Sequence, residues 1–419
     1  MISTLGVLGF AFLIGTPIAF ALALAGLIYM TGAGEYPSSF SSYLFGVLNS
    51  SALLSIPFFI LAAEILSRSG GIKRLINMVD ACGGHNRGGL PVVAVLATAF
   101  FSTICGSSAA TAAAIGRIMI PEMIVRGYDK RFTVGLIASA GGLGILIPPS
   151  IPLIVYGIVT DTSIGALFKA AIVPGILLAA TLAVVAYVLG RRSGVAPSPP
   201  QLWSVRLRSI WQASGILFMP VLILGGISFG FFTPTEASAV SCIYALLLAI
   251  FVYRAPLSSI PSMLTLSAAT AGMILLILAA ANLFSYMLTA ERIPHGVFNY
   301  IVQANLETWQ LLGALMLFFL LAGMFLEIIS IILITMPILA TVLVSSDVNL
   351  IHFAILLILN MELAVITPPI GLNLFIVSAV SRVPVYDVFR GTLPFALAIL
   401  LVLIVMTFVP GTSFLTVGF

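Results

Sequence analysis

Long apolar runs separated by short polar segments fill this chain. The runs recur from Leu5 to Met30, Ala52 to Leu66, Phe132 to Thr160 and Ile164 to Gly190, and they continue to Phe408. Each run approaches or exceeds the roughly 20 residues that a helix needs to span a hydrocarbon core. The pattern therefore predicts an all-α polytopic protein of the lipid bilayer, with its first apolar segment retained.

The composition supports the same class. Hydrophobic residues make up 61% of the 419 residues and charged residues only 7%, whereas a soluble domain carries about 25% charged residues. No basic patch with interleaved aromatic residues suggests nucleic-acid binding, and no convergent set of His, Asp and Glu or of Ser and Lys suggests an enzyme. Cys82, Cys105 and Cys242 lack the spacing of a zinc site or a disulfide framework.

The chain also repeats itself. Five pairs of short motifs recur in the same order at an offset of about 220 residues. They are Thr16-Pro17 with Thr233-Pro234, Ile60–Ala63 with Ile277–Ala280, Pro148-Pro149 with Pro368-Pro369, Phe168-Lys169 with Phe389-Arg390, and Pro174 with Pro394. We therefore expect two structural repeats, residues 1–190 and 213–419, joined by a polar linker of residues 191–212.

The basic residues predict how the repeats are oriented. Cytoplasmic loops carry an excess of Lys and Arg, so the linker is expected in the cytoplasm; its arginines are Arg191, Arg192, Arg206 and Arg208. Five crossings in each half keep most other basic residues on the same side and put both termini in the periplasm. An odd number of crossings inverts the second repeat relative to the first, as in many secondary transporters.

Two segments are expected to form re-entrant helical hairpins. The first, at about residues 91–123, is interrupted at Cys105-Gly106-Ser107-Ser108 and has basic loops at both ends, so it enters and leaves the membrane on one side. The second, at about residues 309–344, is interrupted at Glu327-Ile328-Ile329-Ser330 and enters from the other side. Each interruption precedes a proline pair by the same number of residues, which indicates that the two tips correspond.

Two further segments, at about residues 132–160 and 351–380, are expected to be broken helices. Pro148-Pro149 and Pro368-Pro369 remove amide donors and clash with carbonyl groups one turn earlier. Unpaired backbone groups cost several kcal/mol each in hydrocarbon, so such breaks persist only where protein, water, an ion or a ligand satisfies them. Simple packing kinks are the alternative, and the paired positions beside two hairpins favour a binding site.

The backbone groups that lose their helical hydrogen bonds at the breaks predict which ligands bind there. Carbonyl oxygens that lose their helical donors suit a hard cation such as Na⁺, and helix N-termini favour an anion. Short hydroxyls at these helix starts are expected to contact an anionic substrate: Ser107, Ser108, Thr111, Ser150 and Thr367. Arg117 is a further candidate for the substrate carboxylate, with snorkelling or pairing with Glu122 as the alternative.

The motifs at these breaks resemble those of one family. Cys105–Thr111, Gly144–Ser150, Phe232–Ala237 and Thr367–Pro369 are in combination similar to the large membrane subunit of TRAP (tripartite ATP-independent periplasmic) transporters, within the ion transporter superfamily. The resemblance covers essentially the whole chain. It implies uptake of a small organic acid anion across a bacterial inner membrane, with C4-dicarboxylates and keto acids expected before sialic acid.

The resemblance also implies a mechanism and partners. The expected mechanism is of the elevator type, in which the hairpins and broken helices form a transport domain that moves against a scaffold. The implied partners are a separate small four-helix membrane subunit (Q-type) and a periplasmic substrate-binding protein (P-type). A stand-alone sodium–anion symporter of the same superfamily is the alternative.

Two or more Na⁺ ions are implied as the coupling ions, with H⁺ as the alternative. Carried onto this sequence, the resemblance implies one sodium site at Ser102, Cys105, Gly144, Ile147 and Pro149. A second site is implied at Gly323, Glu327, Ile366 and Pro369. Cys105 stands where serine is also common in the family, which matters little if its backbone oxygen is the ligand.

The remaining acidic residues are assigned structural roles. Glu236 is expected to cap a helix start, and Glu64 and Glu362 are expected to be paired structural acids. An apolar face of Ile72, Leu75, Ile76 and Val79 predicts an interfacial arm helix. Its counterpart in the second half is expected at residues 297–304.

Overall fold

A computed structural model describes residues 6–8, 10–11, 14–34, 37–84, 88–196, 201–292, 296, 299 and 307–409. Every regular element in these ranges is helical. The first half contains α2 (Ile18–Gly32), α3 (Pro37–Gly46), η1 (Val47–Asn49), η2 (Ser51–Leu54), α4 (Ser55–Arg68), α5 (Gly71–Gly83), α6 (Gly89–Cys105), α7 (Ser108–Val125), α8 (Lys130–Gly141), α9 (Leu143–Leu146), α10 (Ile151–Val159) and α11 (Ile164–Arg192).

The second half is likewise helical. It contains α12 (Trp203–Pro220), η3 (Val221–Gly225), α13 (Gly226–Ser228), α14 (Pro234–Leu247), η4 (Leu248–Val252), η5 (Leu257–Ser259), α15 (Ile260–Ala290), α17 (Thr308–Gly323), α18 (Ile328–Ser345), α19 (Leu350–Ala364), α20 (Leu372–Ser381) and α21 (Val385–Phe408). Nine helical stretches among the described residues are long and apolar enough to cross a membrane. Large apolar side chains such as Phe251 and Leu397 also lie exposed on the outside, where lipid can solvate them.

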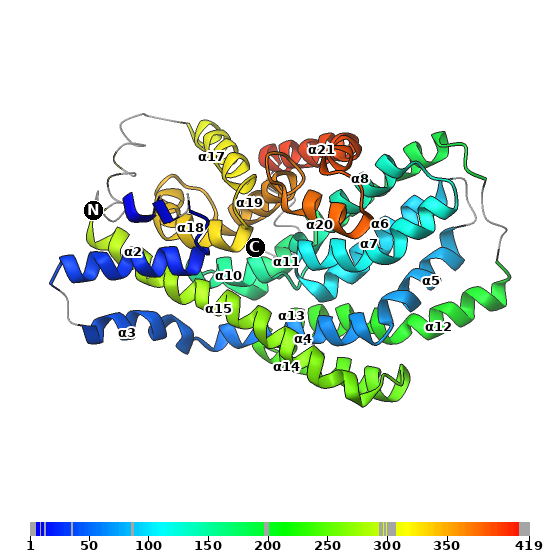
Figure 1. Cartoon of the computed structure of the whole chain (residues 1–419), viewed down its shortest axis with the longest axis horizontal. Coiled ribbons are helices and arrows are strands. Elements are labelled where there is room, and N and C mark those ends of the chain that lie inside the picture. Colours follow the sequence, from blue (N-terminus) through cyan, green and yellow to red (C-terminus); the bar gives the residue numbers. More distant parts are fainter. Residues whose placement is uncertain are drawn as a thin grey trace.

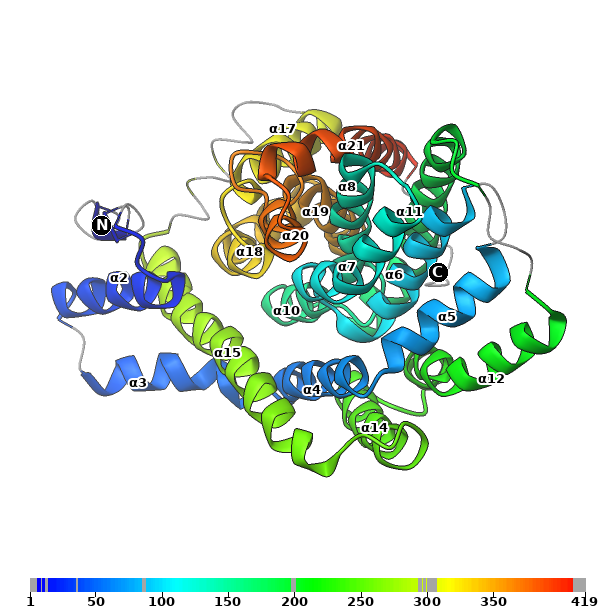
Figure 2. The ribbon, with the colours of Figure 1, turned by 45° about the vertical axis from the view of Figure 1, so that its right-hand side comes forward.

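Two groups of helices divide the molecule (Figures 1 and 2). The inner bundle consists of α6–α11 and α17–α21, and within it α8 packs on α7 and α21. The outer layer consists of α2–α5, α12, α14 and α15, and within it α15 packs on α2 and α4. Segments that are far apart in the sequence therefore meet in each group: residues 89–192 with 308–408, and residues 18–83 with 203–290.

The helix interruptions lie where the prolines predict them. The chain leaves helical geometry between α9 and α10 at Ile147–Ser150, and between α19 and α20 at Val365–Gly371. Both proline pairs contain a cis peptide bond. The chain also turns between α6 and α7 and between α17 and α18, at the two expected hairpin tips. All four interruptions belong to the inner bundle.

The inner bundle is joined by one very close helix crossing. A Cβ atom placed on Gly135 of α8 would lie 2.0 Å from the carbonyl carbon of Gly391 in α21. A Cβ atom on Gly391 would lie 2.0 Å from the Arg131 carbonyl oxygen. Only glycine permits this approach, which is the small-residue packing typical of membrane helices. The crossing joins the first broken helix to α21, the last helix among the described residues.

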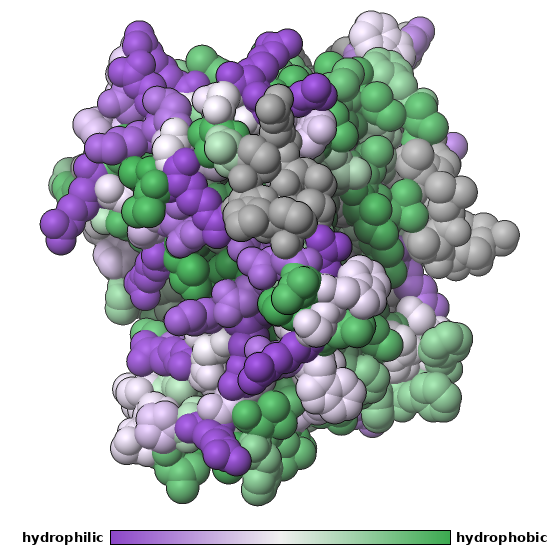
Figure 3. Space-filling view, turned by 90° about the vertical axis from the view of Figure 1, so that its right-hand side faces the viewer, coloured by the Kyte–Doolittle hydropathy of each residue, from purple (hydrophilic) through white to green (hydrophobic). Residues whose placement is uncertain are grey.

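The predicted arm helix is present as α5. Its apolar residues Ile72, Leu75, Ile76 and Val79 are buried and Lys73 is exposed, as the sequence pattern predicts. Hydrophilic side chains gather on the end of the molecule near α5, α8 and α12 (Figure 3). The expected counterpart at residues 297–304 lies outside the described residues, except for Asn299.

The linker is shorter than expected. Residues 191–212 were predicted to form it, but α11 continues to Arg192 and α12 already begins at Trp203. Arg206 and Arg208 therefore lie on the first turns of a helix. In the sequence, basic residues at the end of an apolar helix can be mistaken for a polar loop. Their long side chains can extend from the helix end to water, so the helix itself need not end there.

Candidate functional site

The first hairpin tip is shaped by one glycine and one serine. Helix α6 ends at Cys105, and Gly106 follows in the left-handed region with φ of 63°. Ser107 is extended and caps α7, since its hydroxyl accepts a hydrogen bond from the Ala110 amide. The glycine allows the reversal and the serine satisfies a free amide at the new helix start.

This first tip packs directly on the first broken helix. The Ile151 amide donates to the Gly106 carbonyl oxygen over 3.2 Å. A Cβ atom on Gly106 would lie 2.8 Å from the Pro149 carbonyl oxygen, and one on Gly144 would lie 2.6 Å from the Ser107 carbonyl oxygen. Backbone carbonyl groups of the tip and of the break therefore lie side by side.

The second tip repeats this arrangement with different residues. Glu327 caps α18, where its carboxylate accepts a hydrogen bond from the Ile329 amide over 3.0 Å. The Ile370 and Gly371 amides each donate to the Met324 carbonyl oxygen over 3.3 Å. The second tip is thereby held against the second broken helix.

A cavity of about 920 Å³ separates both tips from the outer layer. Its walls come from α2, α4 and α15 on the outer side, and from the two tips on the inner side. Four helix starts border it, at Ser107 and Ser108 of α7, Ile151 and Pro152 of α10, Ile328 and Ile329 of α18, and Leu372 of α20. Each helix N-terminus carries the positive end of a helix dipole, so this cavity favours an anion.

The charged side chains along the cavity are few. They are Glu64, Arg68, Arg117 and Glu327. Arg68 forms an ion pair with Glu64, one turn away on α4. Arg117 is exposed to the cavity, and no ion pair of its side chain is found in the part of the chain that the structure describes. Its guanidinium is thus the cation best placed to meet a carboxylate there.

The alternative in which Arg117 pairs with Glu122 is wrong. Glu122 instead accepts a hydrogen bond from Arg126 over 2.8 Å, and Arg126 also contacts Asp80 of α5 at 3.3 Å. Residues 122 and 126 are one helical turn apart, whereas residue 117 lies on another side of α7. Arg126 therefore links the inner bundle to the arm helix.

The predicted site residues divide into two sets. Cys105, Ser107, Ser108, Arg117 and Glu327 line the cavity. The others belong to the tips and breaks but do not line the cavity: Ser102, Thr111, Gly144, Ile147, Pro149, Ser150, Gly323, Ile366, Thr367 and Pro369. The hydroxyls of Ser102 and Thr367 each donate to the carbonyl group one turn earlier, at 2.7 Å. Ser150 is fully buried and caps α10.

One polar residue at the site was missed by sequence reasoning. Asn373 of α20 is fully buried, and its amide donates to the Ser108 hydroxyl over 2.7 Å and to the Ala138 carbonyl oxygen over 3.0 Å. A single asparagine in the first turn after a glycine break, at the start of a largely apolar helix, is the signal that could have identified it. It joins the first tip to the second broken helix.

The acidic residues follow expectation only in part. Glu236 forms the predicted cap with Thr233, whose amide donates to its carboxylate over 2.8 Å. Glu64 is paired, as expected. The pairing predicted for Glu362 is wrong, because neither of its carboxylate oxygens has a hydrogen-bond partner among the described residues. The sequence could not indicate that Glu362 lacks a partner, because its neighbours belong to distant segments that only the tertiary fold brings together.

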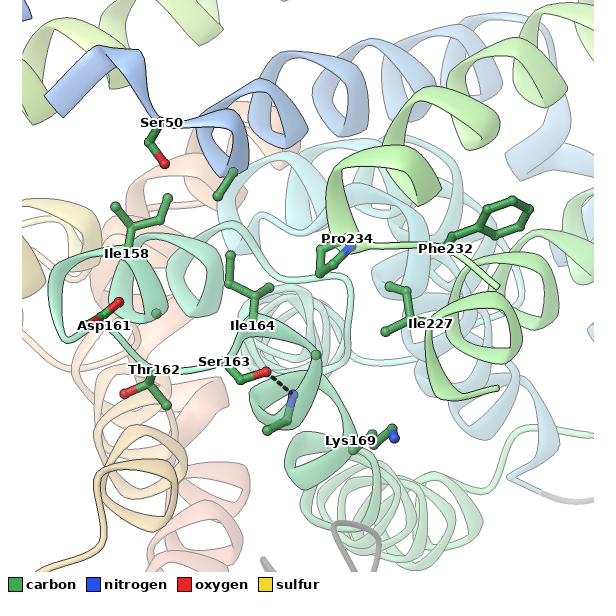
Figure 4. Close-up of a pocket in the computed structure, with 14 residues that line it drawn as sticks. Ser50, Ile158, Asp161, Thr162, Ser163, Ile164, Lys169, Ile227, Phe232 and Pro234 are labelled. Atoms are coloured by element: carbon green, nitrogen blue, oxygen red, sulfur yellow. Dashed lines mark hydrogen bonds between the residues drawn. The ribbon is translucent and has the colours of Figure 1, made fainter. Parts of the chain in front are cut away.

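A smaller cavity of about 590 Å³ lies at the turn between α10 and α11 (Figure 4). Asp161, Thr162, Lys169 and Phe232 are among the residues that line it. The Ser163 hydroxyl beside it accepts the Ala166 amide over 3.3 Å and so caps α11. Its polar groups are thus used largely by the local turn, and neither hairpin tip reaches it.

Comparisons with known proteins give matches over nearly the whole chain. The family described as "Tripartite ATP-independent periplasmic transporter, DctM component" matches residues 5–412. A C4-dicarboxylate TRAP transporter large permease protein DctM from Pseudomonas aeruginosa is 42% identical over 88% of this chain and 87% of the relative. A protein of the same name from Rhodobacter capsulatus is 37% identical over 96% of this chain and 95% of the relative.

One solved structure has a similar fold. It is the YdaH transporter of Alcanivorax borkumensis, described as having an unusual topology. The TM-score is 0.67, with 91% of this chain and 90% of that chain covered, at 12% sequence identity. At this identity the likeness concerns the fold alone, and it agrees with the helical membrane architecture.

Proposed function

The chain belongs to the DctM family of TRAP transporter large permeases, which are not enzymes, and from that premise we propose that it takes up a small organic acid anion, a C4-dicarboxylate or a related carboxylate. The observation that carries this proposal is the cavity bordered by four helix starts and Arg117. The positive ends of four helix dipoles and one guanidinium suit a carboxylate, and few formal charges are needed. The names of the two relatives support a C4-dicarboxylate as the substrate.

We propose that Na⁺ ions are carried together with the substrate and that their gradient drives its uptake. One ion would be held mainly by carbonyl oxygens of Ser102, Cys105, Gly144, Ile147 and Pro149, and a second by Gly323, Glu327, Ile366 and Pro369. The supporting observation is that each tip packs its backbone against a broken helix, where carbonyl groups lie close together. Uncharged oxygens in clusters are the ligands that hard cations prefer. A proton gradient is the alternative driving force.

Movement of the inner bundle against the outer layer is the proposed transport step. The two halves of the chain would be inverted repeats, residues 1–190 and 213–419, each contributing one hairpin and one broken helix to the moving body. In support, both tips and both breaks belong to the inner bundle and the cavity lies at its boundary with the outer layer. In such an elevator mechanism, the two hairpin tips and the bound anion would move across the membrane together.

The proposed location is the bacterial inner membrane, with both termini in the periplasm and the linker in the cytoplasm. The proposed partners are a small four-helix membrane subunit and a periplasmic binding protein that delivers the carboxylate. The tripartite description of the family supports both. A stand-alone sodium–anion symporter remains the competing function.

Reconstitution into proteoliposomes tests these proposals together. We expect uptake of radiolabelled succinate when the chain, its small subunit and the loaded binding protein are combined under an inward Na⁺ gradient. Replacing Na⁺ with K⁺ should abolish uptake, and a proton gradient alone should not restore it. Uptake without the binding protein would favour the stand-alone symporter, and no uptake of any carboxylate would contradict the proposed substrate class.

A further inference from the structure

Glu362 is a buried carboxylate without a partner. It lies on α19 in the middle of the inner bundle and is 0% exposed. Neither of its side-chain oxygens has a hydrogen-bond partner within the described ranges. The other polar groups of this helix are used differently: the Asn360 amide, for example, donates to the Met316 carbonyl oxygen over 2.7 Å. Packing alone does not explain an acid at this position, because any apolar side chain would fill it at lower cost.

The carboxylate lies directly on the first broken helix. A Cβ atom on Gly142 would lie 2.3 Å from the Glu362 Cγ and 2.6 Å from its Oε1. Gly142 joins α8 to α9, immediately before the break at Ile147–Ser150. Ser139, one turn earlier on α8, has a buried hydroxyl that also has no partner among the described residues. Glu362 of one half thus lies against the flexible joint of the other.

No charge in the surroundings balances an ionised Glu362. The helices packed on α19 are α9, α10, α11, α17, α18 and α21. Tyr156 of α10 donates to the Leu350 carbonyl oxygen at the far end of α19, and Asp387 of α21 pairs with Arg131. No titratable side chain of α8, α19 or these helices contacts either Glu362 oxygen in the described structure. Besides Glu362 itself, the titratable side chains on these helices and at the N-terminal caps of α17 and α18 are Lys130, Arg131, Tyr156, Lys169, Tyr187, Arg191, Arg192, Glu307, Glu327, His352, Tyr386, Asp387 and Arg390.

These contacts decide which cation fits. An isolated buried carboxylate costs several kcal/mol if it is ionised, so it is either paired or neutral. A hard cation is held by about six or more oxygen ligands, and no group of three or more His, Cys, Asp or Glu side chains that could hold a metal ion is found among the described residues. A proton needs only the carboxylate itself. We propose that Glu362 is a proton-binding site at the joint between the two broken helices, separate from the cavity and from both proposed sodium sites.

The site gives transport a dependence on pH, an inference that rests on the proposed transport function. With its proton, Glu362 is neutral and α19 packs on Gly142 as observed. When the proton leaves to water, the carboxylate must be solvated, so α19 and the α8–α9 joint separate and the packed break is lost. Uptake is therefore fastest where Glu362 holds its proton and falls as pH rises, by about tenfold per pH unit above the midpoint for a single site.

Infrared spectroscopy tests the proton directly, without transport. The purified complex with its small subunit should show the carbonyl stretch of a protonated carboxylic acid, which should disappear in Glu362→Gln. The matched control is Glu122→Gln, because this exposed acid on α7 should not contribute to the band. Titration of the wild-type band above neutral pH needs no variant, and the band should decline with one midpoint. A missing band, or a band that ignores both pH and Glu362→Gln, would overturn the proposal.

Transport supplies the second measurement. In proteoliposomes under a fixed Na⁺ gradient, succinate uptake by wild type should decline as pH rises above neutral, over the same range in which the infrared band declines and in which succinate stays fully ionised. Glu362→Gln, which is neutral at every pH, should flatten that decline to less than about twofold, whereas Glu122→Gln should follow the wild type. Identical profiles for all three proteins would contradict the proposal. If no form transports succinate, the proposed function fails while the infrared band still decides the proton site.

Discussion

The Asn373 side-chain amide donates a 2.7 Å hydrogen bond to the Ser108 hydroxyl, although 265 positions separate the two residues. Ser108 is the first residue of α7 at the first tip, and Asn373 lies in the first turn of α20 after the second break. The same asparagine donates to the Ala138 carbonyl oxygen of α8. A tip of one half and broken helices of both halves therefore share one buried polar contact.

We expect Asn373→Leu to weaken both stability and uptake. The substitution leaves the Ser108 hydroxyl and the Ala138 carbonyl oxygen buried without this donor, which costs about 1–3 kcal/mol. Thermal unfolding of the detergent-solubilised complex and initial uptake rates measure the two effects. Asn282→Leu is the control, because Asn282 also donates to a carbonyl group, that of Tyr43 at 2.7 Å, but within the outer layer. Equal effects on uptake would remove any special role of the Ser108 contact.

Gly144→Ala should lower the affinity for Na⁺ at the first tip. The new methyl group would lie 2.6 Å from the Ser107 carbonyl oxygen, so the tip and the break must separate. The sodium concentration that gives half-maximal uptake should rise by about tenfold, equivalent to about 1.4 kcal/mol. Gly272→Ala on α15 is the matched control, because nothing lies within 4 Å of its Cβ position. An unchanged sodium dependence in Gly144→Ala would place the ion elsewhere.

Arg117→Lys should reduce carboxylate transport far more than it reduces protein abundance. Lysine keeps the charge but loses the planar, bidentate geometry with which arginine binds a carboxylate. The apparent affinity for succinate and the amount of protein in the membrane should be measured in parallel. Arg208→Lys, on the exposed start of α12, should change neither. Parallel losses of transport and abundance would indicate that Arg117 has only a structural role.

Gly391→Ala should strongly destabilise the inner bundle. Its methyl group would lie 2.0 Å from the Arg131 carbonyl oxygen, so α8 and α21 must move apart along their crossing. Overpacking of this kind costs about 1–3 kcal/mol, and the thermal midpoint of the purified protein should fall accordingly. Gly313→Ala on α17 has free space around its Cβ position and should not lower the midpoint. A normal midpoint for Gly391→Ala would mean that this crossing is not tightly packed in the membrane.

Local chemistry explains which features the sequence could predict. The helices, their interruptions and the cap at Thr233 and Glu236 depend on apolar length, proline, glycine and short polar side chains, all visible within a few residues. The amphipathic α5 is of the same kind. These features could be predicted because each is decided by residues within one or two turns.

Contacts between distant segments could not be predicted in this way. Arg126 contacts Asp80 as well as Glu122, because tertiary packing brings the arm helix to the same end of α7. Glu362 has no hydrogen-bond partner among the described residues, because α19 packs this side chain against the glycine joint at Gly142. The role of Asn373 depends on a residue in the other half of the chain. Sequence periodicity contains no information on such neighbours.

The crossing of Gly135 and Gly391 has a consequence for how the protein is made. Helix α8 leaves the ribosome long before α21, which is the last helix of the described chain. The surface over Gly135 therefore has no backbone neighbour until α21 has been synthesised. This part of the inner bundle cannot reach its final packing before that later helix is present.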